Sequence, residues 1–130
     1  MNFLLKWLIT LTVCTIVLVA VQARAGDEWS KKDIQLEIAC VVVNVLDGVT
    51  TERILDENNR AFEAGPARLL FGDRPSQAEL AGVVVVSSVL HALVTHYMPK
   101  QYRQYWQWSW ASVKLLAIGN NLHVGLGIQF

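Results

Sequence analysis

Four long apolar blocks, separated by short stretches that hold most of the charge, dominate the 130-residue sequence. Hydrophobic residues make up 53% of the chain and charged residues only 17%, against about 25% in an average soluble domain. Blocks this long and this poor in charge are difficult to bury in one small soluble core, whereas they suit helices that cross the ~30 Å hydrocarbon layer of a bilayer. The sequence therefore predicts an all-α fold, a transmembrane helical bundle.

The first block follows the pattern of a secretory signal peptide. A lysine precedes an apolar run over residues 7–21, and Ala23 and Ala25 then form a cleavage site of small side chains. The same block is also just long enough to remain as an uncleaved anchor. We therefore expect residues 1–25 to be a signal peptide or an N-terminal anchor that adds a fourth span, and residues 26–130 to form the helical membrane domain.

Three spans are expected within this domain, at about 33–51, 78–98 and 107–127. The middle span is the clearest, because it contains no lysine or arginine and begins with the S-x-x-E capping box of Ser76 and Glu79.

The segments between the spans carry their own expectations. The first helix of the domain is expected to continue to Glu63, where the Gly65-Pro66 pair stops it. A loop is expected over 67–75, and residues 100–107 are expected to form a polar, aromatic connector.

Polar residues follow one face of the 33–51 span at steps of three and four. They are Asp33, Glu37, Cys40, Asn44, Asp47 and Thr51. At 100° per residue these positions fall within about a third of the helix circumference, and the remaining face is aliphatic. An acidic side chain at the bilayer centre costs roughly 2.5–3.5 kcal/mol, so it is usually paired with neighbouring polar groups. This pattern predicts that the polar face turns inward, against the other spans.

Polar candidates inside the membrane occur on all three spans. They are Glu37, Asn44, Asp47, His91, Lys114, Asn120 and Asn121. Depths counted at about 1.5 Å of rise per residue indicate two polar layers. The upper layer would bring Lys114 toward Glu37 and His91. The lower layer would bring Asp47 toward one residue of the asparagine pair at 120–121.

No recognised catalytic or metal-binding motif accompanies these residues. His91 and His96 are five residues apart, about 140° around a helix, so they do not share a ligand site as an i, i+4 pair does. Cys14 and Cys40 lie inside apolar blocks and are interpreted as small apolar residues. We therefore expect no metal and no cofactor, and favour a structural role for the polar residues over transport, proton relay, ligand binding or catalysis.

Short motifs between residues 47 and 121 resemble those of a family of small uncharacterised bacterial membrane proteins. These motifs are the run DGVTT at 47–51, the turn EAGP at 63–66, Lys114 and the asparagine pair at 120–121. That family has a D-x-x-T-T span, an E-x-N-P-like turn and a late span with an asparagine. Gly65 stands where the family has asparagine. The resemblance implies a fold of a few spans and no particular chemistry.

Taken together, the sequence favours a small multi-pass protein of the bacterial inner membrane that is not an enzyme. The expected surroundings are lipid, with self-association or another membrane protein as partner. Nucleic acid is not expected, because the net charge is zero and the basic residues are scattered. Two alternatives stay open, a phage-type holin or exclusion protein, and an intramembrane enzyme or transport accessory that uses Asp47 and His91.

Overall fold

A computed structural model of the chain describes residues 8, 12–13, 29–57 and 66–125. Its long helices are α2 (Lys31–Glu57), α4 (Gln77–Tyr97) and α5 (Lys100–Gly125), and a short helix, α3 (Pro66–Phe71), precedes α4. The described residues contain no strand. The expected all-α fold is therefore confirmed for this part of the chain, whereas most of the first block, including Cys14, lies outside the described residues.

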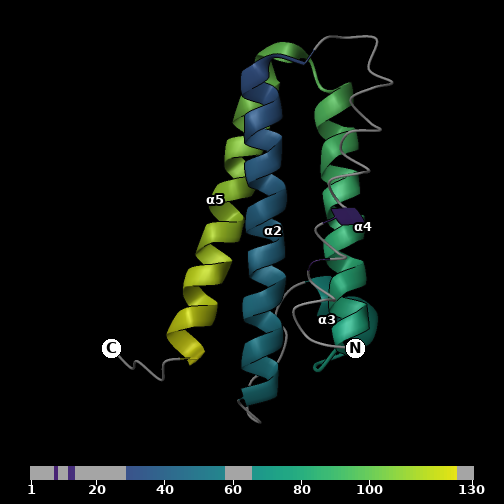
Figure 1. Ribbon diagram of the computed structural model, residues 1–130, viewed down its shortest axis with the longest axis vertical. Coiled ribbons are helices and arrows are strands. Elements are labelled where there is room, and N and C mark those ends of the chain that lie inside the picture. The colour runs from purple at the N-terminus through teal and green to yellow at the C-terminus, as the bar shows by residue number, and fades with distance from the viewer. Residues whose placement is uncertain (1–7, 9–11, 14–28, 58–65, 126–130) are drawn as a thin grey trace.

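α2 lies between α4 and α5 and contacts both of them (Figure 1). α4 runs antiparallel to α2, and α5 returns parallel to α2. A two-residue break at Met98 and Pro99 joins α4 to α5 at the end of the bundle where α2 begins. The three long helices thus form a bundle in which α2 supplies the central face.

Both ends of α4 follow from local sequence signals. Its start has the predicted capping box, in which the Ser76 amide donates to Glu79 Oε2 at 2.6 Å and the Glu79 amide donates to Ser76 Oγ at 3.4 Å. Its end comes before Met98, whose ψ of 140° is extended. A residue that precedes proline is sterically disfavoured from helical conformation, which explains why α4 ends there.

The predicted connector over 100–107 is wrong, because α5 begins at Lys100. Proline favours a helix start. Its φ is already helical, and the backbone N–H that it lacks would have no partner within the helix at that position. The Tyr102 amide donates to the Pro99 carbonyl at 2.9 Å, so the helix resumes immediately after the break. The polar residues of this segment therefore lie on a helix rather than in an open loop.

The predicted loop over 67–75 is also partly wrong, because it contains most of α3. This helix starts with Pro66 and closes at Gly72, whose φ of 87° is readily adopted only by glycine. The Gly72 amide donates to the Arg68 carbonyl at 2.9 Å. The expected continuation of α2 is seen as far as Glu57, and the remainder lies outside the described residues.

Two helices are long and apolar enough to cross a membrane, α2 over Lys31–Asp56 and the whole of α4. In each of them only 33% of the most apolar window is buried inside the protein, whereas the core helix of a soluble protein is mostly buried. α5, which contains the third expected span, does not meet the same criterion of length and composition. The structure thus supports two of the expected spans.

The bundle has two small buried aliphatic clusters, Val41, Val45 and Val84 and, nearer the far end of α2, Leu55 and Leu80, but it also buries many polar side chains and exposes many apolar ones. Its largest fully buried side chains are all polar, namely Arg103, Gln107, Glu37, Glu52, Asn44 and Thr95. By contrast, Ile38 is 52% exposed, Val86 57% and Leu116 75%. Soluble proteins show the reverse preference, since charged residues are almost never fully buried unless paired. The polar interior is therefore the feature of the fold that requires explanation.

Candidate functional site

The polar face of α2 turns inward as predicted. Asp33, Glu37, Cys40 and Asn44 are buried, and Asp47 and Thr51 are half-buried. Their partners group into three clusters along α2. The upper cluster is Glu37, His91, Thr95 and Gln107; the middle cluster is Asn44, Ser87 and Ser88; the lower cluster is Asp47, Thr50, Thr51, Lys114 and Asn121.

In the upper cluster, a single carboxylate joins all three long helices. Glu37 is 0% exposed, and its Oε1 lies 2.7 Å from Nδ1 of His91 on α4. Its Oε2 accepts hydrogen bonds from Thr95 Oγ1 at 3.2 Å and from Gln107 Nε2 at 2.9 Å. Because charged acceptors make stronger hydrogen bonds than neutral ones, this carboxylate is the main polar link of the bundle.

The His91 ring packs against two indoles of α5, which also contact each other. It stacks on Trp106 with ring centroids 5.3 Å apart and 14° between planes, and the Trp110 centroid lies 4.9 Å away. Its Nε2 is buried and has no hydrogen-bond partner within the described part of the chain. The geometry thus provides an acid–base pair with one ring nitrogen fixed by Glu37. The described residues hold no group of three His, Cys, Asp or Glu side chains suited to a metal ion.

The middle cluster is an amide–hydroxyl contact between α2 and α4. Asn44 Nδ2 lies 2.8 Å from both Ser87 Oγ and Ser88 Oγ, and 3.1 Å from the Val84 carbonyl. Ser87 Oγ in turn donates to the same carbonyl at 3.2 Å. Every group in this cluster is neutral. We therefore interpret its hydrogen bonds as structural contacts that hold α2 against α4.

The lower cluster joins α2 to α5. Asp47 Oδ2 lies 2.8 Å from Lys114 Nζ, and Asp47 Oδ1 accepts from Asn121 Nδ2 at 3.4 Å. The same amide nitrogen lies 3.1 Å from Thr50 Oγ1 and 2.9 Å from Thr51 Oγ1. The charge of Asp47 is therefore matched by a lysine and supported by an amide.

The predicted upper layer is correct for Glu37 and His91 but wrong for Lys114, which pairs with Asp47 instead. The depth count started too late on the chain, because α5 already begins at Lys100. Gln107, rather than Lys114, therefore lies at the same level as Glu37.

The predicted lower layer is confirmed for Asp47 and Asn121, whereas Asn120 is exposed. Asp47 and His91 fall in different clusters, so the structure does not assemble the acid–base site that an enzyme using both would need. Cys40 is buried as expected, and its thiol donates to the Gln107 carbonyl at 3.3 Å.

Arg103 and Gln107 are interior residues that the sequence interpretation placed in the connector. They are 1% and 0% exposed. Together with Lys114 and Asn121 they recur at steps of four, seven and seven, which is one face of a helix. Extending the helical pattern back to Lys100 would have identified both residues.

Arg103 caps the C-terminal end of α4. Its Nε lies 3.1 Å from the carbonyls of Thr95 and Met98, and its Nη2 lies 3.0 Å from the His96 carbonyl. The last carbonyls of a helix have no partner within it, and they carry partial negative charge. A single guanidinium thus provides hydrogen-bond donors to three carbonyl oxygens at the point where α4 ends and α5 begins.

Replacing Arg103 with lysine is expected to lower the free energy of unfolding by about 1.5–3 kcal/mol, the range for hydrogen bonds to charged groups. A lysine ammonium keeps the charge but lacks the planar fork that reaches three carbonyls at once. Thermal unfolding in detergent, followed by circular dichroism, measures the change. The matched control is Arg68→Lys, because Arg68 is exposed and pairs with Asp73 on the surface. Equal shifts for the two variants would contradict the capping role.

The chain matches no protein-family model, no curated protein and no solved structure. The resemblance to the small bacterial membrane family therefore stays a prediction from short motifs. The function has to be inferred from the geometry of the bundle.

Proposed function

We propose that the chain is a small multi-pass protein of the bacterial inner membrane, with α2, α4 and α5 each crossing the bilayer. The observation that carries this proposal is the burial pattern of the bundle, whose largest fully buried side chains are polar while many of its large aliphatic side chains are exposed. In water this distribution would be unfavourable, because polar side chains would be withdrawn from solvent while apolar side chains would be exposed to it. In lipid it is favourable, because polar groups inside hydrocarbon must find partners within the protein.

The third span in this proposal is the larger part of α5. From Trp106 to the end of α5 the only lysine or arginine is Lys114, and Asp47 neutralises that charge. The outward side chains of this stretch include Leu115, 55% exposed, and Leu122, 52% exposed. The tryptophans at the start of the stretch suit the aromatic belt found at membrane interfaces.

The role that the clusters support is structural. Asn44, Arg103 and Gln107 each donate to a backbone carbonyl of a neighbouring helix, as interhelical contacts in membranes do. On this proposal the chain is not an enzyme, and its apolar outer faces contact lipid or other membrane-embedded helices, including further copies of this chain. The first block adds either a signal peptide or a fourth span.

Cysteine accessibility tests the proposed spans directly. In a background with both native cysteines changed to serine, Ile38→Cys and Leu116→Cys are expected to resist a water-soluble maleimide in intact membranes, because lipid covers both positions. Asp73→Cys, between α3 and α4, is the control and is expected to label whenever its side of the membrane is opened. The chain itself is expected to stay in the membrane pellet after alkaline extraction and to need detergent for release.

Two results would overturn the proposal. Recovery of a monomer without detergent, or labelling of Leu116→Cys as rapid as that of Asp73→Cys, contradicts a bundle with three spans. Dye leakage from vesicles that contain the purified chain would contradict the structural role and indicate the holin class.

A further inference from the structure

The outward face of α5 differs from the outward faces of α2 and α4. In the two apolar helices, every exposed position between residues 36 and 52 and between residues 80 and 95 is apolar. In α5, the exposed positions between residues 106 and 122 include Ser109, Ser112 and Asn120. α5 is also the long helix that does not meet the criterion of length and composition for a membrane span. Its lower hydropathy therefore comes partly from polar groups that point away from the bundle.

These polar groups form one stripe along α5, on the side away from α2. Counted at 100° per residue, five exposed positions fall within about 100° of the helix circumference. They are Ser109, Ser112, Leu116, Gly119 and Asn120, and we call them the outer stripe. α5 lies at the edge of the bundle, with α2 on its other side (Figure 1). The stripe thus follows a face of α5 that α2 does not cover.

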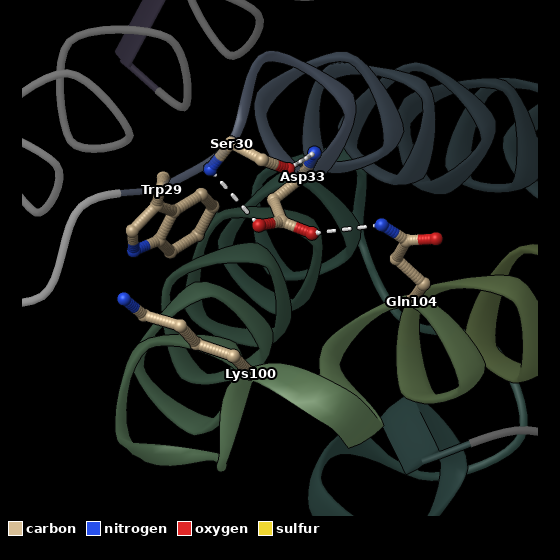
Figure 2. Close-up of a pocket in the computed structure, with 5 residues that line it drawn as sticks. All are labelled: Trp29, Ser30, Asp33, Lys100 and Gln104. Carbon is tan, nitrogen blue, oxygen red and sulfur yellow. Dashed lines mark hydrogen bonds between the residues drawn. The ribbon is translucent and has the colours of Figure 1, made fainter.

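The opposite face of α5 is already used inside the bundle. At its start, Gln104 is directed toward Asp33 of α2, with Nε2 and Oδ1 3.5 Å apart (Figure 2). Farther along the helix, Gln107, Lys114 and Asn121 bond to α2 in the same way. Turning the outer stripe inward would break all of these contacts. A partner for the stripe therefore has to come from outside the bundle.

Asn120 lies inside the proposed bilayer. The adjacent Asn121 amide contacts Thr50 and Thr51, which lie within the apolar helix Lys31–Asp56. A serine hydroxyl in a helix can bond a carbonyl of its own helix. The exposed Asn120 amide, by contrast, has no hydrogen-bond partner in the described part of the chain, and water is absent from hydrocarbon. This amide therefore needs a partner on a second membrane-embedded chain.

We propose that the outer stripe binds a second copy of this chain, with the two α5 helices paired about a two-fold axis perpendicular to the membrane plane. The inference rests on the proposed membrane location, because copies that insert the same way place Asn120 at the same depth. A side-chain amide has both donors and an acceptor, so the two Asn120 side chains satisfy each other across the axis. The stripe carries no charge that would select a charged partner. Its small residues let the two backbones approach closely.

Cysteine crosslinking in intact membranes tests which face of α5 forms the pair. In a background with both native cysteines changed to serine, Leu116→Cys and Asn120→Cys are expected to give disulfide-linked dimers on oxidation. Leu116→Cys keeps the Asn120 amide, so it reports on the unperturbed pair. The matched control is Leu122→Cys, which is 52% exposed and close in depth but about 160° from Asn120 around the helix. It is expected to stay monomeric.

Sedimentation equilibrium of the full chain in detergent measures the strength of the pair. Asn120→Ala is expected to weaken the dimer about tenfold, as for the loss of interhelical hydrogen bonds. Gly119→Leu is expected to weaken it further, because the added side chain holds the two helices apart. A Cβ at Gly119 meets nothing within 4 Å in the single chain, so this variant is expected to fold normally. Leu122→Ala is the control and is expected to leave the affinity unchanged.

The outcomes separate this inference from the proposed function. An unchanged chain that is monomeric but still resists alkaline extraction overturns the pairing and leaves the proposed function standing, with lipid against the stripe. Equal crosslinking at Leu116→Cys and Leu122→Cys, or a product whose mass is not twice that of the chain, also overturns it. A dimer that forms without detergent, with crosslinks confined to the stripe, supports the pairing face but overturns the membrane location. A second α5 keeps water from Leu116 as lipid does, so the accessibility test is unaffected.

Discussion

Replacing Glu37 by alanine is expected to lower the free energy of unfolding by about 3 kcal/mol, the upper end of the range for leaving buried hydrogen-bonding groups without a partner. Its carboxylate accepts from His91, Thr95 and Gln107, and the side chain is 0% exposed. Interhelical hydrogen bonds in membranes average only about 0.6 kcal/mol each, so three of them account for about 2 kcal/mol. The remainder comes from donors that stay buried without a partner.

The tryptophans beside His91 provide the signal for this measurement, because the loss of stacking changes their fluorescence during unfolding in mixed micelles. Ile38→Ala is the matched control, since Ile38 is the next residue of α2 and is 52% exposed. It is expected to change stability by less than about 1 kcal/mol. Glu37→Gln keeps one acceptor oxygen and should fall between the two. An unchanged stability for Glu37→Ala would show that the upper cluster does not hold the bundle.

Features that depend on residues close in sequence were predictable. The steps of three and four along α2 place Glu37, Asn44 and Asp47 on one face, and the structure has this face turned inward. The capping box of Ser76 and Glu79 fixed the start of α4 to within one residue, because both partners lie in the same turn. Such signals need no knowledge of any other helix.

The start of α5 was missed because polarity in a short segment was interpreted as exposure to water. Arg103 and Gln107 are polar but point inward, where carbonyl groups at the end of α4 and on α2 accept their hydrogen bonds. Only the three-dimensional arrangement supplies those acceptors. In a bundle with a polar interior, hydropathy alone does not separate a connector from the first turns of a helix.

The partner of Lys114 was missed for a different reason, which is the register between helices. Asp47 and Lys114 are 67 residues apart, whereas Glu37 and Gln107 are 70 apart, and no local pattern fixes either offset. Glu37 and Asp47 are ten residues apart, about 15 Å along α2. The level expected for Lys114 belongs to Gln107, seven residues or about two turns earlier on α5, so the error in register was about two turns. The charge pairs themselves help to select the register, because a shifted helix would leave both charges unpaired.

Removing both members of the lower ion pair is expected to be far less harmful than removing either one. Asp47→Leu leaves the Lys114 ammonium without its carboxylate, and an unpaired charge inside the bilayer costs about 2.5–3.5 kcal/mol. Lys114→Leu leaves Asp47 with the Asn121 amide as its remaining side-chain contact on α5. The double variant replaces a buried pair with apolar groups, a change that is often neutral. We therefore expect the summed loss of unfolding free energy in the two single variants to exceed the loss in the double variant by at least about 2 kcal/mol.

The size of this coupling also reports on the surroundings of the bundle, because an ion pair in water couples weakly. The matched pair is Arg68 and Asp73, 2.7 Å apart with side chains 47% and 63% exposed. Its double-mutant cycle should give less than about 1 kcal/mol, the range for surface pairs. The Asp47 and Lys114 side chains are 17% and 18% exposed in the protein alone, and lipid would exclude the remaining water. If both cycles gave the same small coupling, the lower cluster would be in water, and the proposed membrane-spanning bundle would be wrong.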